Sequence, residues 1–215
     1  MTFSRRNPPI LDPTIRLAVC VSGGGTTLQN LIDRIDDGRL TAEIVQVVAS
    51  KPGIGAISRA EKSGIPVSVE VRGKRSVEEF SDGVFDAIRR SGADLVVLGG
   101  FLSLIRIPVD YVGRVINVHP SLIPAFSGKG FHGKAVHQAA IDSGVKLSGC
   151  TVHFADDTYD TGPIIFQIPV PVLNDDTAET LAARVFEAEC EALPEAIELF
   201  AAGKLTVRGR RVLIG

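Results

Sequence analysis

The stretch Asn117-Val118-His119-Pro120 holds a side-chain amide and an imidazole two residues apart, directly after an apolar run typical of a strand. An amide N–H can stabilise a developing oxyanion, and an imidazole exchanges protons near neutral pH. Taken alone, such a stretch is also consistent with a capped turn and a loop histidine. The chain has only four histidines, and none of their spacings is typical of a zinc site. We therefore expect acid–base chemistry at Asn117 and His119, without a metal ion.

A glycine-rich segment, Ser22-Gly23-Gly24-Gly25-Thr26-Thr27, connects a predicted strand to a predicted helix. Free backbone N–H groups, the positive end of a helix dipole and two hydroxyls together favour a phosphate monoester. The segment lacks the lysine of an ATP-binding P-loop, and Leu28 stands where a dinucleotide-binding turn has its third glycine. A strand-to-helix turn without a ligand is the alternative.

A third segment, Asp160-Thr161-Gly162-Pro163, places a carboxylate on a turn between two predicted strands. A carboxylate there can orient an imidazole and stabilise its protonated form. A solvated turn fits the same residues, and Asp156 and Asp157 are alternatives for the carboxylate. We expect Asp160 to be the partner of His119.

Composition limits the class of protein. The 215 residues are 45% hydrophobic, which is enough for one large core, and 23 basic against 25 acidic residues give a net charge of −2. The absence of a basic cluster with aromatic residues argues against nucleic acid and favours small-molecule substrates. Three widely spaced cysteines indicate reduced thiols in a cytoplasmic protein. We expect a flexible leader over residues 1–13 and one domain over 14–215, monomeric or homodimeric, away from membranes.

Short runs rich in Val and Ile alternate with segments of helical spacing through the first half of the chain. The predicted strands are 15–21, 44–49, 66–71, 94–98 and 115–118, and the predicted helices are 27–35, 55–62 and 77–90. Ser76 and Glu79 form an S-x-x-E capping box before the third helix, and Gly92 ends it. The alternation predicts a single-domain, Rossmann-like α/β fold with a mostly parallel twisted sheet and helices on both faces.

The pattern changes after His119. A glycine-bearing stretch, 125–133, leads into a helix that ends near Ser143, and two strands follow at 147–154 and 164–172. These strands predict an antiparallel C-terminal part of the sheet. A final helix is expected to start near Asp176 with Glu179 as its capping partner, and 205–214 is expected to form a hairpin.

In a parallel sheet, ligands bind beyond the carboxyl ends of the strands. Residues 22–27, 99–101 and 117–119 each follow or end a predicted strand. We therefore expect these three distant segments to line one crevice.

Five segments together closely resemble the phosphoribosylglycinamide formyltransferase family. They are Ser22–Gly25, Gly100–Leu102, Asn117–Pro124, Gly149–Phe154 and Asp160–Ile165, within a resemblance that covers roughly residues 15–205. The resemblance implies transfer of the formyl group of 10-formyltetrahydrofolate to the amine of glycinamide ribonucleotide, in de novo purine biosynthesis.

The resemblance also implies a role for each matching residue. Asn117, His119 and Asp160 would be the catalytic residues. The substrate phosphate would contact Gly24, Gly25, Thr26 and Thr27, and the ribose would contact Glu189, for which a helix surface charge is the alternative. The folate would lie against Leu102, Ser103, Leu104 and Ile105 and against the 155–160 turn with Asp156 and Asp157.

In the implied mechanism the substrate amine attacks the formyl carbon directly. Asn117 and a protonated His119 would stabilise the tetrahedral oxyanion, while Asp160 would hold His119, raise its pKa and order a proton-relaying water. Two departures from the family pattern stand out. Thr26-Thr27 replaces the usual last residues of the phosphate loop, and Ser103 stands where some relatives carry an arginine beside the folate.

Other activities fit the residues less well. A methionyl-tRNA formyltransferase would need a further tRNA-binding domain, and a formyltetrahydrofolate hydrolase a further regulatory domain. A nicotinamide oxidoreductase would need an acidic residue where Ser50-Lys51 stands. A non-catalytic phosphate-binding module is the remaining alternative.

Overall fold

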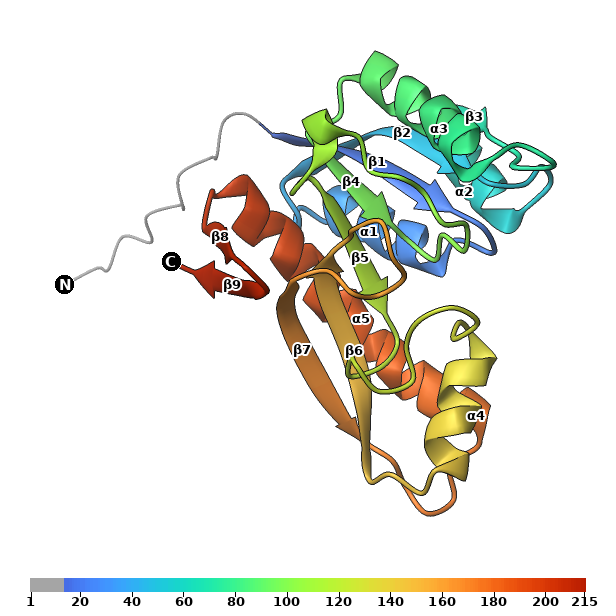
Figure 1. The fold of residues 1–215 in the computed structure, drawn as a ribbon, viewed down its shortest axis with the longest axis vertical. Coiled ribbons are helices and arrows are strands. Elements are labelled where there is room, and N and C mark those ends of the chain that lie inside the picture. The colour runs from blue at the N-terminus through green and yellow to red at the C-terminus, as the bar shows by residue number, and fades with distance from the viewer. Residues whose placement is uncertain (1–13) are drawn as a thin grey trace.

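The computed structural model describes residues 14–215, which contain one nine-stranded sheet in the order β3-β2-β1-β4-β5-β6-β7-β9-β8 (Figure 1). The first five strands run parallel: β1 (Ile15–Val21), β2 (Ala42–Ala49), β3 (Val67–Val69), β4 (Leu95–Leu98) and β5 (Val115–His119). The predicted leader, residues 1–13, lies outside the described residues. The mostly parallel Rossmann-like sheet expected from the sequence is thereby confirmed.

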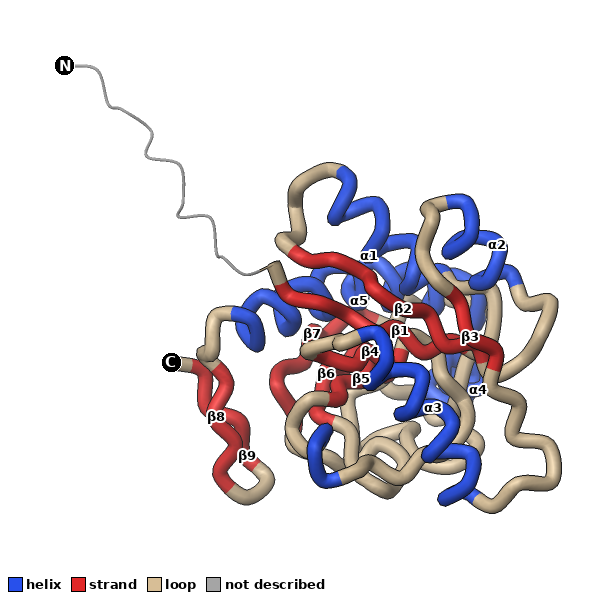
Figure 2. The backbone as a smooth tube through the Cα atoms, turned by 90° about the horizontal axis from the view of Figure 1, so that it is seen from above, coloured by secondary structure: helices blue, strands red, loops and turns tan. Residues whose placement is uncertain are grey.

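Helices cover both faces of this sheet (Figure 2). Their bounds are α1 (Thr26–Asp36), α2 (Gly55–Lys62), α3 (Val77–Ser91), α4 (Lys134–Asp142) and α5 (Ala178–Ala201), with a short 3-10 turn, η1, at Val109–Tyr111. Along β1, Leu17 and Val19 pack toward the core under α1, α2 and α5, whereas Ala18 and Cys20 pack toward α3. This alternation follows from the period of two in a strand, and burial of both faces explains why every residue of the strand except the exposed Arg16 is apolar.

The α3 helix starts and ends where the sequence predicts. The hydroxyl of Ser76 accepts a hydrogen bond from the Glu79 backbone N–H at 3.1 Å, and the Glu79 carboxylate accepts one from the Ser76 N–H at 2.9 Å. Phe80, Val84 and Ile88 are fully buried on its inner face. Gly92 ends the helix with φ of 66°, a left-handed conformation that glycine adopts without a Cβ clash.

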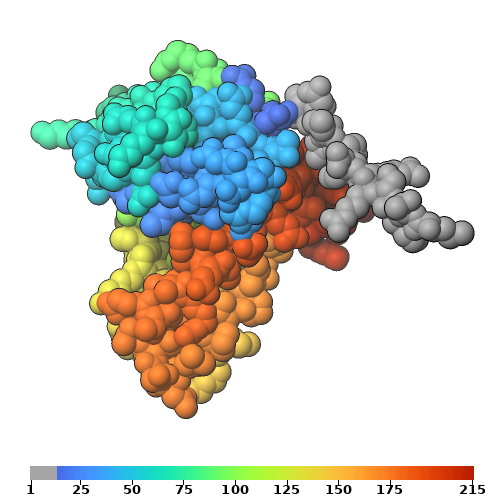
Figure 3. Space-filling view, turned by 180° about the vertical axis from the view of Figure 1, so that it is seen from behind, coloured from blue at the N-terminus to red at the C-terminus, as the bar shows by residue number. Residues whose placement is uncertain are grey.

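The C-terminal part of the sheet contains antiparallel pairings, as predicted. β6 (Leu147–Phe154) pairs with β5 and with β7 (Ile164–Pro171), and α5 packs along both strands and reaches α1. In the space-filling view from behind, this region forms the lower part of the molecule, beneath the parallel half (Figure 3). The predicted hairpin is present as β8 (Leu205–Arg208) and β9 (Arg211–Ile214).

The predicted cap of α5 is wrong. The helix begins at Ala178, and Thr177 and Thr180 cap it reciprocally through their hydroxyls. The carboxylate of Asp176 instead accepts hydrogen bonds from the Leu173 N–H and from Arg184. Arg184 therefore binds the carboxylate that was predicted to cap the helix, and Thr177 caps the helix instead. The predicted partner, Glu179, forms an ion pair with Lys134 of α4.

None of the helices within residues 14–215 combines the length and apolar character needed to cross a bilayer.

The contribution of the α3 capping box to the stability of the protein can be tested directly. Ser76→Ala should lower the free energy of unfolding by about 0.5–2 kcal/mol, because the N–H of Glu79 loses its acceptor. Ser58→Ala is the matched control, since Ser58 is exposed inside α2 and should change stability by at most about 0.5 kcal/mol. Urea unfolding of both variants measures the difference. Equal stabilities would show that the box contributes nothing.

Candidate active site

The site lies where the strand order reverses, between β1 and β4, at the carboxyl ends of both strands. The hydroxyl of the buried Ser22, directly after β1, links the segments that follow β1, β2 and β4. It accepts hydrogen bonds from the Leu102 N–H at 3.0 Å and from the Ser50 hydroxyl at 2.7 Å. The Ser22 N–H donates to the Gly100 carbonyl at 3.2 Å. The loops that follow β1 and β4 are therefore held together before any ligand binds.

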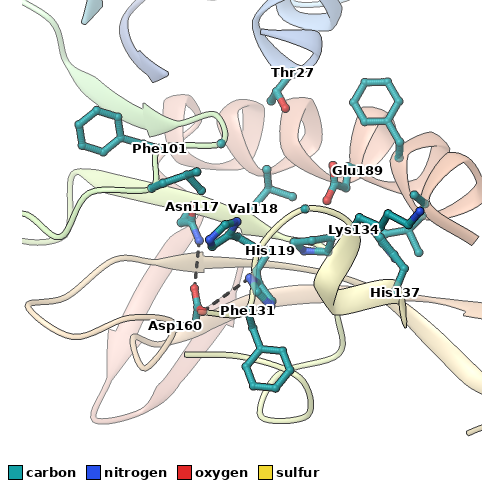
Figure 4. Close-up of a pocket in the computed structure, with 18 of the residues that line it drawn as sticks. Thr27, Phe101, Asn117, Val118, His119, Phe131, Lys134, His137, Asp160 and Glu189 are labelled. Atoms are coloured by element: carbon teal, nitrogen blue, oxygen red, sulfur yellow. Dashed lines mark hydrogen bonds and ion pairs between the residues drawn. The ribbon is translucent and has the colours of Figure 1, made fainter. Parts of the chain in front are cut away.

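A cavity of about 690 Å³ opens beside these loops (Figure 4). Its volume lies within the roughly 300–1,000 Å³ typical of small-molecule sites. The cavity is lined by segments that follow or end β1, β4 and β5, by α5 and by the 128–134 loop. Its lining residues include Thr26, Thr27, Gly100, Leu102, Asn117, His119, Asp160 and Glu189. The expected convergence of residues 22–27, 99–101 and 117–119 on one crevice is thus observed.

Asn117, His119 and Asp160 face one another in this cavity. The Asn117 amide Nδ2 lies 3.4 Å from Asp160 Oδ1, and His119 Nδ1 lies 3.6 Å from Asp160 Oδ2. Asp160 Oδ2 also accepts a hydrogen bond from the Gly128 N–H at 2.8 Å. Figure 4 shows these three side chains on one side of the cavity, with Thr27 and Glu189 on the other.

The Asp160 turn is held against β6 by a close backbone approach. A Cβ added at Gly162 would lie 1.8 Å from the Phe154 carbonyl oxygen, so only glycine fits there. Asp160 itself has φ of 57°, in the left-handed region that aspartate tolerates better than most residues. Both features of the D-x-G sequence therefore serve to turn the carboxylate toward the cavity.

The hydrogen bonds of His119 fix its neutral tautomer. Its Nε2 lies 2.9 Å from the Phe126 carbonyl oxygen, and a carbonyl can only accept, so Nε2 carries the hydrogen. The Nδ1 of a neutral ring therefore presents its lone pair. Burial lowers the pKa of His119 below its ordinary value, although the Asp160 carboxylate and the Phe126 hydrogen bond both act to raise it. The expected effect of Asp160 on the pKa of His119 is therefore present, but burial outweighs it in the empty site.

The carboxyl group of Asp160 is itself ionised readily. Burial acts to raise its pKa, but hydrogen bonding within the site, including the bond from the Gly128 N–H, outweighs burial, and the pKa is lowered overall. The site therefore holds a carboxylate next to a neutral imidazole near neutral pH.

Glu189 faces the same cavity from α5. Burial raises the pKa of its carboxyl group to about 7. Near neutral pH it can therefore both donate and accept hydrogen bonds, as neighbouring ligand hydroxyls would require. The cavity is lined from α5 by Glu179 and by a set of residues that recur at helical spacing on one face: Ala178, Ala182, Val185, Phe186 and Glu189.

A family model described as formyl transferase matches residues 15–197. The chain belongs to the formyl transferase family. Among similar proteins is a phosphoribosylglycinamide formyltransferase of Arabidopsis thaliana named as chloroplastic, 42% identical over 81% of this chain and 61% of the relative. A trifunctional purine biosynthetic protein of Gallus gallus is 39% identical over 90% of this chain and 19% of the relative. A glycinamide ribonucleotide transformylase from Symbiobacterium toebii superposes with a TM-score of 0.86 at 38% identity, covering 94% of each chain.

The chain therefore spans about 60% of the length of the plant relatives it matches.

Within this formyl transferase fold, the predicted phosphate residues fall into two groups. Thr26 and Thr27 line the cavity, whereas Gly24 and Gly25 are packed beside α2 and are not among the lining residues. In the described part of the chain, none of the backbone N–H groups from Gly23 to Thr27 has a hydrogen-bond partner. These unpaired donors are what an anion needs.

The predicted folate residues also divide. Leu102 lines the large cavity, whereas Ser103, Leu104, Ile105 and Asp156 line a separate hollow of about 60 Å³. Asn117, Phe101, Tyr159 and Asp160 line both spaces, which therefore meet at the catalytic candidates. The hollow is smaller than typical ligand sites, so a bicyclic ring can enter it only if the surrounding loops move.

Asp157 does not join these residues. Its Oδ1 accepts a hydrogen bond from the Ile107 N–H at 2.9 Å, and its carboxylate lies 3.7 Å from Arg106. The carboxylate therefore holds the loop after β4, and Asp157 lines neither space. Asp156 accepts hydrogen bonds from Thr158 and Thr161 and so shapes the turn that carries Asp160. Neither is placed to replace Asp160 as the partner of His119.

His153, to which the sequence pattern assigns no role, lies behind Asn117. The Nδ1 of His153 lies 2.8 Å from the Phe154 carbonyl oxygen and so carries the hydrogen, which leaves Nε2 to accept from Asn117 Nδ2 at 3.1 Å. This contact points the Asn117 amide nitrogen toward Asp160. The signal was the antiparallel register of β5 and β6, which pairs Asn117 with His153 and which spacing alone does not reveal.

The balance of burial and charge at His119 can be measured by proton NMR. The imidazole of His119 should titrate below its ordinary pKa of about 6.5, and in Asp160→Asn its pKa should be lower still, because the carboxylate that favours the imidazolium is gone. Asp82→Asn, an exposed change on α3, is the control and should leave the titration in place. An unchanged or raised His119 pKa in Asp160→Asn would contradict the geometry described above.

Proposed function

We propose that this protein transfers the formyl group of 10-formyltetrahydrofolate to the amine of glycinamide ribonucleotide. The observation that carries the proposal is the convergence of Asn117, His119 and Asp160 on one cavity that also holds free N–H donors after β1 and a protonatable carboxyl group on α5. The names of the similar proteins support the same activity.

The arrangement offers a place for each part of the ribonucleotide. Its phosphate would accept hydrogen bonds from the N–H groups between Gly24 and Thr27, at the positive end of the α1 dipole. Its ribose hydroxyls would bind Glu189, across the cavity from His119. With both ends held, the amine is directed toward the catalytic residues, which reduces the entropy cost of bringing two substrates together.

The folate would enter from the side of Leu102–Ile105. That segment follows β4, and the hollow it lines meets the large cavity at Asn117 and Asp160. A formyl group attached to the folate would then lie between the two spaces, next to the amide of Asn117. The small present volume of the hollow implies that folate binding includes a movement of the 101–107 or 155–160 loop.

The chemistry begins with attack of the neutral amine on the formyl carbon. A nitrogen–carbon bond forms, and the carbonyl electron pair moves to the formyl oxygen, where the Asn117 amide N–H replaces its long contact with Asp160 by a hydrogen bond to the oxyanion. The amine proton passes to the free Nδ1 of His119, and the resulting imidazolium is stabilised by Asp160.

Collapse of the tetrahedral intermediate completes the reaction. The oxyanion re-forms the carbonyl, the bond to the folate nitrogen breaks, and the imidazolium returns the proton to that nitrogen, directly or through a water. The products are tetrahydrofolate and the formylated ribonucleotide, and His119 ends neutral as it began. No covalent enzyme intermediate and no metal ion take part in this scheme.

The location and assembly of the protein belong to the proposal as well. The composition favours a cytoplasmic protein that does not bind nucleic acid, and we expect it to be a monomer or a homodimer. A single formyltransferase domain over residues 14–215 is consistent with the one continuous sheet.

A coupled assay tests the activity and the roles of the side chains together. Mixing the protein with glycinamide ribonucleotide and 10-formyltetrahydrofolate should release tetrahydrofolate, followed by absorbance. His119→Ala and Asp160→Asn should each lower kcat by roughly 10²–10³-fold with a native circular dichroism spectrum. Asp82→Asn should retain full activity.

Two results would refute the assignment. Near-normal kcat in both variants would remove these residues from the chemistry. Release of tetrahydrofolate that does not depend on glycinamide ribonucleotide would indicate hydrolysis of the formyl donor instead of transfer.

A further inference from the structure

The loop after β1 is supported from behind by α2, on the side away from the cavity lining. The Ala56 N–H at the start of α2 donates to the Gly23 carbonyl at 3.2 Å. The Arg59 Nε, one turn further along the helix, donates to the Gly24 carbonyl at 2.9 Å. Arg59 Nη1 also donates to the side-chain oxygen of Gln29 on α1, at 2.8 Å. The guanidinium therefore joins the loop to both helices.

These contacts determine where the loop's N–H groups point. In a planar trans peptide, the carbonyl of one residue and the N–H of the next point in opposite directions. With the Gly23 and Gly24 carbonyls turned toward α2, the N–H groups of Gly24 and Gly25 must point away from it. Since α1 lies between α2 and α5, that direction is the cavity side.

The packing leaves little freedom for the loop to turn over. A Cβ on Gly25 would lie 2.7 Å from the Cβ of Ala56, and one on Gly55 would lie 3.2 Å from the Gly24 carbonyl oxygen. The loop and the start of α2 are thus in direct backbone contact. A change in how Arg59 holds Gly24 is expected to alter the direction of the N–H groups without opening a cavity in the core.

Arg59 also supplies charge. It is the one cationic side chain that hydrogen-bonds to the 22–27 loop within residues 14–215. Lys129 and Lys134 also line the cavity, but Lys129 belongs to the opposite loop and Lys134 is the first residue of α4. Lys134 forms an ion pair with Glu179. A dianionic phosphate bound at the loop would therefore have the Arg59 guanidinium, in a half-buried position, as its neighbouring full positive charge.

We propose that Arg59 is the positioning residue of the phosphate site: through the Gly24 carbonyl it aims the N–H donors at the phosphate, and its charge raises the affinity of the site for a dianion. This inference rests on the proposed function for the identity of the natural ligand. The recognised chemistry, a phosphate monoester dianion, can be tested apart from catalysis.

The experiment measures binding of inorganic phosphate by 31P NMR titration in the wild type and in three variants. Arg59→Met removes the donors and the charge, Arg59→Gln keeps a donor without the charge, and Arg59→Lys keeps the charge with fewer donors. The phosphate dissociation constant should rise about tenfold or more in Arg59→Met, somewhat less in Arg59→Gln, and about threefold or less in Arg59→Lys.

Arg39→Met is the charge-matched control. Arg39 is exposed, pairs with Asp37 after the far end of α1, and should leave phosphate binding unchanged. In the formyl transfer assay, the Arg59 variants should raise KM for glycinamide ribonucleotide in the same order, with kcat and KM for the folate within about threefold of the wild type. A merely structural role would lower the melting temperature and move both KM values together.

The outcomes separate the two proposals. Equal phosphate affinity in the wild type, Arg59→Gln and Arg59→Met, or no phosphate binding by the wild type, would overturn the role of Arg59 whatever the enzyme's activity. Weaker phosphate binding in the graded order supports it even where formyl transfer fails, and that failure would count against the proposed function alone. Should Arg59→Met not fold, the Gln and Lys variants carry the same comparison.

Discussion

The site depends on one buried carboxylate. Asp160 lies within 4 Å of His119, Asn117 and His153 and accepts a hydrogen bond from the Gly128 N–H. An ionised group in such surroundings persists only when its neighbours compensate for the water it has lost. That requirement links the Asp160 turn, the end of β5, β6 and the 128–134 loop into one unit. The positions of these groups are therefore coupled through the contacts of this one carboxylate.

The two halves of the sheet bring the residues of the site together from opposite directions. The parallel half brings the loops after β1 and β4 to the switch point, where Ser22 ties them together. The antiparallel half brings Asp160 and His153 to the end of β5, and α5 carries Glu189 back to the same cavity. The site thus forms at the junction of the two halves of the sheet.

Local signals in the sequence were enough to predict much of this arrangement. The α3 capping box, the Val-rich parallel strands and the glycine turn after β1 depend on neighbours along the chain, and the structure has them where the pattern predicts. The cap of α5 was mispredicted because Arg184, eight residues away, takes the Asp176 carboxylate. The pairing of Asn117 with His153 depends on the register of β6, and the lowered pKa of His119 depends on burial by the whole fold. Neither the register of a strand nor the burial of a side chain can be deduced from the spacing of residues in the sequence.

The most direct test of the central claim is a crystal structure with glycinamide ribonucleotide and an unreactive folate analogue that keeps the formyl carbonyl. We expect the phosphate at the Gly24–Thr27 N–H groups, and the carbonyl carbon about 3–3.5 Å from the amine with its oxygen at the Asn117 amide. We expect His119 Nδ1 and Asp160 beside the same carbon, which is the central claim. A complex with the phosphate at the Lys129 and Lys134 end of the cavity, and the carbonyl away from Asn117 and His119, would contradict it.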